Sequence, residues 1–367
     1  MNRDPSERRR APATAWRDRD PDRDGAARSP VPVIAGIGHW LPPTVLTNDV
    51  LGDRLGTPAD WLSSRTGIRS RHVVAPGTAT VALAVEAGRR AMDCAGVEQV
   101  DALLVATVTP DRLCPPSAPE VAARLAQPGI AAFDVGAACS GFLYGLAVAG
   151  GLIATGTARR VLLIGSETMT SLVDPSDPAT SAIFADGAGA VVLRAGEPGE
   201  PGAVGPVILG SDGSRANLIE VPAGGSLCPS QTPAECGGGE RFLSVSGPDV
   251  FRKAVTRMAA VSREAAEARG WEIEDVDRVV AHQANAHILA AVARKLAVPP
   301  GRMATNIATV GNTSAASVPI LLAQEAADGG IKPGDRVLAT AFGAGLTWAA
   351  TTFVWPRLPT VPEPVRP

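Results

Sequence analysis

Short apolar runs alternate with longer alanine-rich segments along most of the chain. The short runs have the length of buried strands, whereas the longer segments repeat apolar residues every three to four positions, as helices do. Strands are expected at 31–36, 102–107, 131–135, 160–164, 188–193, 278–281, 336–341 and 348–354. Helices are expected at 79–95, 117–125, 141–155, 249–269, 286–296 and 314–328. Strands separated by helices indicate crossover connections and a mostly parallel sheet covered on both faces.

This pattern occurs twice. The helical segment 79–95 followed by DALLVATV resembles the segment 249–269 followed by DRVVAHQA, and each pair precedes another helix. We therefore predict an α/β fold made by duplication, with one half at 31–205 and the other at 206–357. The glycine- and proline-rich stretch GEPGEPGAVGP breaks the pattern between the two halves.

The two ends of the chain lack any apolar periodicity. Residues 1–30 hold eight arginines and six acidic residues among Pro, Ala and Ser, and residues 358–367 are rich in proline. Such composition cannot bury a core, so we expect a disordered N-terminal extension and a loose C-terminal tail.

The overall charge excludes some classes of partner. The chain has 34 basic and 37 acidic residues, a formal net charge of −3, and only 4% aromatic residues. A nucleic-acid-binding protein or a membrane-surface protein would show a basic excess, and a base-stacking surface would need aromatic side chains. We therefore expect neither nucleic acid nor membrane as a partner.

One segment, residues 135–158, has 24 residues without a charge, which is long enough to span a bilayer. It begins after Asp134 and contains six glycines. A helix that is apolar all round can equally form the centre of a large protein, and we favour that interpretation. Gly141 and Gly145, four residues apart, would then allow close helix packing.

The cysteines and histidines give no metal-binding pattern. The five cysteines are Cys94, Cys114, Cys139, Cys228 and Cys236, and the chain has four histidines. The spacing of Cys228 and Cys236, with no histidine nearby, does not fit a zinc site. Because the N-terminus MNRDPSERRR lacks the apolar core of a secretory signal, we expect free thiols and a cytoplasmic location.

A candidate nucleophile lies in the segment DVGAACSGF, at 134–142. A strand is expected to end at Val135 and a helix to begin just after Cys139. The unpaired N–H groups and the dipole of a helix N-terminus stabilise a thiolate, so this thiol is expected to be reactive well below about pH 8. The alternative is an inert buried cysteine, which is common in protein cores.

Two further segments place polar side chains in loops that follow strands or precede helices. His282 follows the expected strand 278–281, and Asn312 lies in a glycine turn before a helix. In doubly wound sheets ligands bind at the carboxyl ends of strands, so Cys139, His282 and Asn312 could converge on one cleft. Taken alone, His282 could be a structural histidine and Asn312 could be a helix-capping asparagine. The loop 224–240 is expected to be mobile and to cap this cleft.

Together these segments resemble the β-ketoacyl-acyl-carrier-protein synthase III family of the thiolase superfamily. The resemblance is carried by DWLSSRTGIRSRH (60–72), DVGAACSGF, IFADGAGAVVL (183–193), AHQAN (281–285), GNTSAASVPI (311–320) and AFGAGLTW (341–348). It implies a five-layered αβαβα fold with mixed, mostly parallel sheets, and a homodimer. It also implies a decarboxylative Claisen condensation, in which Cys139 carries the acyl group while His282 and Asn312 stabilise the enolate of a malonyl thioester. The N–H groups of Cys139 and Ala344 would form the oxyanion hole, and no metal or bound cofactor is implied.

The resemblance also implies which residues hold the substrate. Trp61 and Arg65 match positions that grip the nucleotide end of coenzyme A, and Ala284 lies within AHQAN. Two family arginines, one for the adenine ring and one for the acyl carrier protein, are replaced here by Pro178 and His287.

A third departure concerns the acyl pocket, because Pro115 replaces a residue that is often an aromatic gate. These departures suggest a starter-unit enzyme of polyketide-type metabolism that uses acyl-coenzyme A or an acyl carrier protein. Two alternatives are a non-decarboxylating acyltransferase, which passes the acyl group from Cys139 to an alcohol or amine, and a catalytically silent subunit.

Overall fold

The computed structural model describes residues 29–228 and 241–360 of the 367-residue chain. Most of the N-terminal extension and of the C-terminal tail expected from the sequence, and most of the loop expected to cap the cleft, lie outside the described residues.

The first sheet has five strands in the order β1 (Val31–Trp40), β7 (Asp186–Gly196), β6 (Arg160–Thr168), β4 (Ala102–Ala106) and β5 (Ala131–Val135). β7 runs antiparallel to both of its neighbours, while β6, β4 and β5 run parallel to one another. Four of the five strands therefore point in one direction. The strand β4 is buried along its whole length, as its continuous apolar sequence predicts.

The second sheet repeats this arrangement with four strands, β8 (Ile208–Ser211), β13 (Thr347–Val354), β12 (Arg336–Gly343) and β11 (Arg278–Ala281). β13 is antiparallel to both neighbours, as β7 is, and β12 is parallel to β11, as β6 is to β4. A single parallel bridge between Val279 and Met303 occupies the place that β5 takes in the first sheet. The matching order confirms the predicted duplication.

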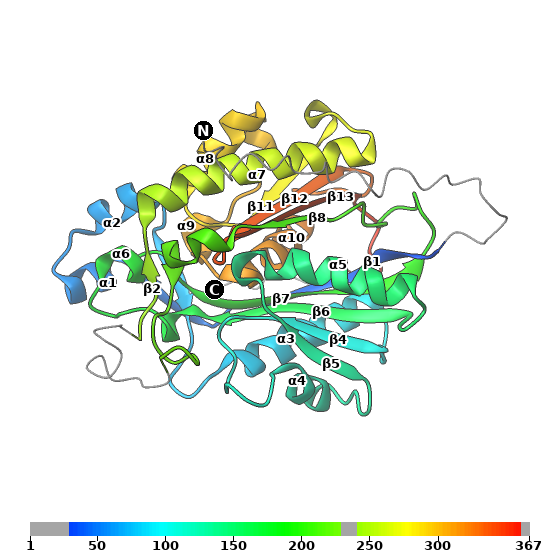
Figure 1. The fold of residues 1–367 in the computed structure, drawn as a ribbon, viewed down its shortest axis with the longest axis horizontal. Coiled ribbons are helices and arrows are strands. Elements are labelled where there is room, and N and C mark those ends of the chain that lie inside the picture. Colours follow the sequence, from blue (N-terminus) through cyan, green and yellow to red (C-terminus); the bar gives the residue numbers. More distant parts are fainter. Residues whose placement is uncertain (1–28, 229–240, 361–367) are drawn as a thin grey trace, which may run out of the picture.

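Helices cover both sheets and fill the space between them (Figure 1). α5 (Gly141–Ala154) and α10 (Ser317–Ala327) lie between the sheets and contact both. α3 (Thr80–Ala95) and α4 (Ala118–Arg124) cover the outer face of the first sheet, and α7 (Gly247–Arg269) and α8 (Ala286–Leu296) cover the second. The result is the five-layered αβαβα fold that the sequence predicts.

The uncharged segment 135–158 forms the end of β5, a turn and the 14-residue helix α5. At 1.5 Å per residue this helix is about 21 Å long, shorter than the ~30 Å apolar core of a bilayer. No helix in the described part of the chain is long and apolar enough to cross a membrane. A Cβ added at Gly145 would collide with Leu163 of β6, so the predicted close packing of this buried helix is confirmed.

Several short elements have no counterpart in the sequence-based prediction. They are β2 (Thr44–Thr47), α1 (Asn48–Leu55), α2 (Ala59–Thr66), β3 (Ser70–Val73), α6 (Pro178–Ser181), β9 (Ile219–Glu220), β10 (Ser244–Val245) and α9 (Ile307–Val310), together with β8. All of them have eight residues or fewer, which is too short to show a hydrophobic period. The division into halves at residues 205 and 206 stays a prediction.

The expectation of free thiols is correct for part of the chain. Cys94, Cys114 and Cys139 are free, but Cys228 is disulfide-bonded. The prediction is wrong for Cys228 because spacing along a chain does not report whether two Cα atoms lie within the roughly 4.4–6.8 Å that a disulfide needs.

Candidate active site

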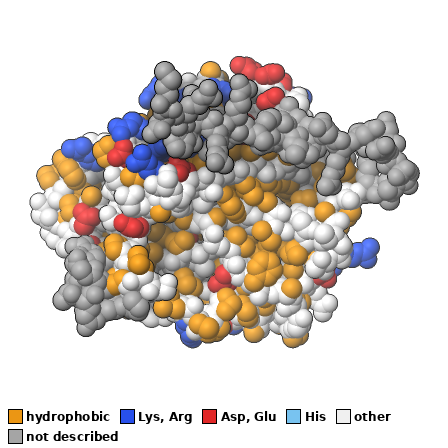
Figure 2. Space-filling view, in the orientation of Figure 1, with side chains coloured by type: hydrophobic (Ala, Val, Ile, Leu, Met, Phe, Trp, Pro, Cys, Tyr) orange, Lys and Arg blue, Asp and Glu red, His pale blue; other side chains and the backbone are white. Residues whose placement is uncertain are grey.

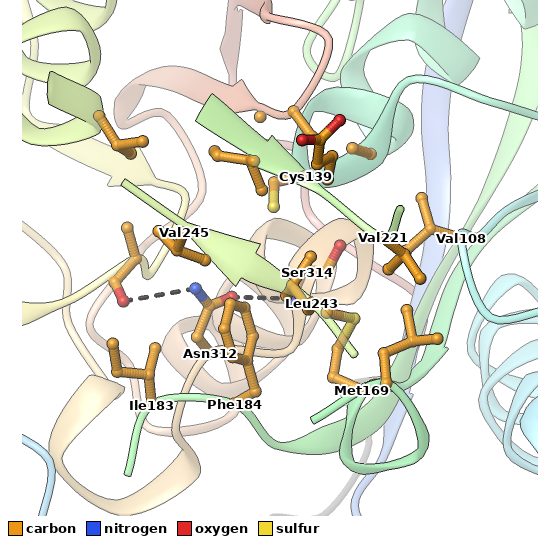
Figure 3. A pocket seen from close by; sticks show the side chains of 18 of the residues that line it. Val108, Cys139, Met169, Ile183, Phe184, Val221, Leu243, Val245, Asn312 and Ser314 are labelled. Atoms are coloured by element: carbon orange, nitrogen blue, oxygen red, sulfur yellow. Dashed lines mark hydrogen bonds between the residues drawn. The ribbon is translucent and has the colours of Figure 1, made fainter. Parts of the chain in front are cut away.

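A cavity of about 710 Å³ brings the three predicted catalytic residues together. Its wall includes Cys139, His282 and Asn312, and also Ala284 and Ala344. Figure 3 shows Cys139 and Asn312 facing a space bordered by apolar side chains. The apolar wall residues include Val108, Met169, Ile183, Phe184, Val221, Leu243, Val245, Met258, Ile288 and Phe342. A cavity of this size and lining fits an extended apolar ligand.

Cys139 is positioned by the sharp turn between β5 and α5. Ala138 has a φ of 45°, a left-handed conformation that a residue with a Cβ adopts at a cost of roughly 1–3 kcal/mol. The turn is held by β13, because the Thr347 hydroxyl donates to the carbonyl of Ala137 at 3.0 Å and the Ser140 hydroxyl donates to that of Thr347 at 3.2 Å. The thiol thus lies at the N-terminal end of a central helix, as predicted.

The electrostatics of Cys139 differ from the prediction. Burial, together with the charge of Glu167, raises the pKa of the thiol to about 11, although the hydroxyl of Ser314 acts to lower it. Raising a thiol pKa from its ordinary 9.0 to about 11 corresponds to about 2.7 kcal/mol, whereas a helix N-terminus typically contributes about 0.3–1 kcal/mol. The expected low thiol pKa is therefore wrong, because burial outweighs the helix dipole.

His282 follows β11, where its backbone N–H donates to the carbonyl of Thr340 at 2.8 Å. Its side chain is 2% exposed, and burial lowers the imidazole pKa to about 4. Its Nδ1 atom is buried without a hydrogen-bond partner among the described residues. The ring is therefore neutral at physiological pH and has donor or acceptor capacity for a ligand.

Asn312 is fixed through both its backbone and its side chain. Its N–H donates to the carbonyl of Ile183 at 2.9 Å, and its own carbonyl accepts from the N–H of Ala185 at 2.9 Å. The side-chain Oδ1 accepts from the N–H of Ser314 at 2.9 Å, and Nδ2 donates to the carbonyl of Ala284 at 3.4 Å (Figure 3). Asn312 thus both stabilises its own turn and presents an amide N–H₂ group at the cavity.

The segment AFGAGLTW packs directly against the Cys139 turn. A Cβ added at Gly343 would lie 2.7 Å from the backbone nitrogen of Cys139, so only glycine allows this approach. Ala344 follows in the cavity wall. This contact brings the end of β12, a strand of the second sheet, beside the candidate nucleophile.

The residues predicted to hold coenzyme A form a separate group outside the cavity wall. Trp61 on α2 is 42% exposed, and the Arg65 guanidinium lies 5.2 Å from the centre of its ring. His287, in the first turn of α8, hydrogen-bonds the carbonyl of Ser64 at 2.9 Å. The same end of α8 follows Ala284 in the cavity wall, so this group lies beside the site.

The cavity wall includes part of the loop 224–240 but neither Pro115 nor Pro178. Pro115 is not part of the cavity wall, although the nearby, almost fully exposed Leu113 is. Pro178 begins α6 and is also outside the wall. Gly224 and Gly225 line the cavity, whereas residues 229–240 of the expected cap lie outside the described part of the chain.

Sequence reasoning missed two polar residues near the nucleophile. Ser314 lines the cavity, and Glu167 lies behind it, fully buried at the end of β6. Ser314 is visible in the motif GNTSAAS, but nothing in RVLLIGSET distinguishes Glu167 from an acid on a solvated turn. Within the described residues no group of three or more His, Cys, Asp or Glu side chains could hold a metal ion.

Comparison with known families agrees with this geometry. A model of the family described as 3-oxoacyl-[acyl-carrier-protein (ACP)] synthase III matches residues 133–213, and one of its C-terminal part matches residues 266–355. The β-ketoacyl-[acyl-carrier-protein] synthase III 3 of Streptomyces coelicolor is 50% identical over 329 residues, which cover 89% of this chain and 98% of that protein.

Solved structures show the same fold. The crystal structure of 3-oxoacyl-(acyl carrier protein) synthase III from Pseudomonas aeruginosa has a TM-score of 0.84 and 44% identity, covering 90% of this chain and 100% of that chain. The priming β-ketosynthase from the R1128 polyketide biosynthetic pathway has a TM-score of 0.82 and 31% identity, covering 91% of this chain and 99% of that chain.

Proposed function

Because the chain belongs to the 3-oxoacyl-[acyl-carrier-protein] synthase III family, we propose that Cys139, His282 and Asn312 carry out a decarboxylative condensation of an acyl thioester with a malonyl thioester. The observation that supports these roles most strongly is the convergence of the three side chains on one apolar cavity. The proposed steps use side chains and backbone groups, and none of them calls for a metal or a bound cofactor.

In the first step the sulfur of Cys139 attacks the thioester carbonyl and the donor thiol leaves. The negative charge that develops on the carbonyl oxygen needs preorganised donors. The backbone N–H groups of Cys139 and Ala344 are suited to this role, since Gly343 lets the two backbones approach closely. The product of this step is an acyl-Cys139 intermediate.

In the second step a malonyl thioester loses carbon dioxide, and the resulting enolate carbon attacks acyl-Cys139. The enolate oxygen requires uncharged or positive hydrogen-bond donors. Asn312 presents its amide N–H₂, and neutral His282 can donate from one ring nitrogen. The cysteine is released as a β-ketoacyl thioester forms.

The cavity and its surroundings indicate the class of substrate. The apolar wall suits the hydrocarbon part of an acyl group, and Trp61 with Arg65 offers a ring and a cation for a nucleotide or phosphate beside the site. The relatives' names include an acyl carrier protein, and one names the priming of polyketide biosynthesis. We propose that the acyl donor is acyl-coenzyme A or an acyl carrier protein and that the enzyme supplies a starter unit. The cytoplasmic location stays a prediction.

We also propose that the protein is a homodimer. β5 is the last strand of its sheet, and its outer edge pairs with no other strand in the part of the chain that the structure describes. Phe133 on β5 and Val148 on α5 are each 37% exposed, and Figure 2 shows hydrophobic side chains gathered over this part of the surface. Sedimentation measurements should show a dimer for the wild type and a monomer for Phe133→Glu. A monomeric wild type would contradict the proposal.

Intact-mass measurement tests the catalytic proposal. The protein is offered a panel of acyl thioesters and then a malonyl-carrier chase. We expect a mass gain that is absent in Cys139→Ala, followed by a β-ketoacyl product and loss of carbon dioxide. An acyl-enzyme that survives the chase and is discharged by an alcohol or amine would instead show a non-decarboxylating acyltransferase. No acylation with any donor would indicate a silent subunit.

A further inference from the structure

A buried carboxyl group lies directly behind the cavity wall. Glu167, near the end of β6, is 0% exposed, and none of the ion pairs formed within the described residues includes it. Removing a carboxylate from water costs several kcal/mol unless it is well hydrogen-bonded. The proposed condensation gives this group no role.

The hydrogen bonds of Glu167 are unevenly divided between its two oxygens. Oε2 accepts three, from the Thr107 hydroxyl at 3.0 Å, the N–H of Val108 at 3.0 Å and the Thr109 hydroxyl at 2.7 Å. Oε1 accepts one, from the Ser314 hydroxyl at 3.0 Å. The carboxylate is therefore held firmly by one oxygen and keeps acceptor capacity on the other, which faces Ser314.

Ser314 connects this carboxyl group to the nucleophile. Its φ of 49° is a strained, left-handed conformation, and it lines the same cavity as Cys139. Its hydroxyl stabilises the charged form of Cys139 and so lowers the pKa of the thiol. A hydroxyl has a single proton and can donate to either Glu167 or a Cys139 thiolate, but not to both. The two arrangements differ by the transfer of one proton along the chain of three groups.

We propose that Glu167 accepts, through the Ser314 hydroxyl, the proton that Cys139 loses when it attacks the acyl thioester. This proposal rests on the proposed role of Cys139 as nucleophile. As the S–C bond forms, the thiol proton passes to Ser314 Oγ, and the Ser314 proton passes to Glu167 Oε1. When the donor thiolate leaves, the proton returns along the same path to its sulfur. The enzyme therefore gains and loses no net proton in the exchange.

The other charged groups near the site are less suited to this role. The titratable or charged residues in the described cavity wall are Cys139, His282, Glu220 and Arg241. Burial lowers the pKa of His282 to about 4, so it is a weak base, whereas burial raises the pKa of Glu167 and makes it a better one. Glu220 is exposed.

Among the described residues, the neighbouring strands give the Ser314 hydroxyl no other carboxylate partner. On β7, next to Glu167, the carboxylate of Asp186 is engaged by the hydroxyl and N–H of Thr170 and by the N–H of Val74, away from Ser314. Glu167 is thus the carboxyl group within hydrogen-bond reach of Ser314 among the residues that the structure describes.

The test is the pH dependence of Cys139 acylation, measured by intact mass under single-turnover conditions. For the wild type we expect a rate nearly independent of pH between about pH 7 and pH 9, because the reactive state already contains its proton acceptor. In Glu167→Gln and Ser314→Ala only the free thiolate reacts. Their rates should be about 100-fold lower near pH 7 and rise close to tenfold per pH unit.

Thr107→Val is the matched control, because it removes a hydrogen bond to Glu167 outside the path to Cys139. Thr107→Val should keep the flat pH profile of the wild type. If the carboxyl group had a merely structural role, all of the variants would keep that flat profile. A Glu167→Gln profile parallel to that of the wild type would overturn the relay, and Ser314→Ala provides a second reading if Glu167→Gln does not fold. Failure of the wild type to acylate would instead contradict the proposed function.

Discussion

The contact between Gly343 and the Cys139 turn leads to a quantitative prediction for Gly343→Ala. The added Cβ would lie 2.7 Å from the Cys139 nitrogen and 3.2 Å from its Cα, whereas ordinary contacts begin at 3.4 Å. The atoms approached belong to the backbone, so no side chain can turn away, and β12 and the turn must separate by about 0.7 Å. A displacement near 1 Å at a reacting group costs on the order of a hundredfold in rate. We expect acylation of Cys139 to slow between tenfold and a hundredfold.

The assay is the single-turnover rate of acyl-enzyme formation, followed by intact mass. Gly136→Ala is the matched control, since a Cβ at this position, three residues before the nucleophile, meets nothing within 4 Å. It should retain the wild-type rate to within about twofold. A Gly343→Ala rate equal to that of the control would refute the argument that this contact positions the nucleophile. Thermal unfolding separates a loss of fold from the local effect, because overpacking costs about 1–3 kcal/mol.

Three further predictions follow from packing and burial. Gly145→Ala should lower the melting temperature, whereas Gly151→Ala should raise it. Both substitutions gain about 1 kcal/mol of helix propensity, but only the Cβ at position 145 collides with Leu163. Equal shifts of the melting temperature would contradict close packing of α5. The unfolded state protonates His282 near pH 6.5 and the folded state near pH 4, so stability present above pH 6.5 is lost as the pH falls. Urea titrations should show that the wild type loses roughly 3 kcal/mol more than His282→Gln between these pH values, and equal losses would contradict neutral burial. In Ser314→Ala, which lacks the proposed proton path to Glu167, alkylation of Cys139 by iodoacetamide should have its midpoint above pH 9.0, because burial raises the thiol pKa to about 11; a midpoint below about pH 8 would contradict this direction.

The sequence predicts the long elements well because each carries its own periodicity. The bounds expected for β5, β11 and α8 agree with the structure, and those of α3 and α5 differ by one residue at one end. α1, α2, β2 and β3 escape prediction because each gains its stability from neighbours. For example, Asn48 of α1 donates to the carbonyl of Ile68 at 2.7 Å. Such contacts across 20 residues leave no hydrophobic period in the sequence.

In the candidate site, too, the sequence predicts local features of the chain but not those that depend on distant residues. Cys139, His282 and Asn312 stand in motifs that mark the ends of strands and the starts of helices, so the sequence places them correctly. The pKa of the Cys139 thiol was predicted wrongly mainly because burial raises it, and the charge of Glu167, which Ser314 links to the site across 147 residues, adds to this effect. A helix N-terminus is a local feature of the chain, whereas burial is a property of the assembled fold, and the latter has the larger effect on the thiol.

The duplication explains why these distant residues meet. Each half contributes a short turn before a central helix, and each turn contains a residue with a Cβ at positive φ, Ala138 at 45° and Ser314 at 49°. Each turn is packed against a glycine of the opposite sheet. Gly343 of β12 lies against the Cys139 turn, and Gly165 of β6, the equivalent strand, has its Cβ position 2.5 Å from the carbonyl oxygen of Ala315. Neither half can therefore form its part of the cavity alone, because each turn is completed by a strand of the other half.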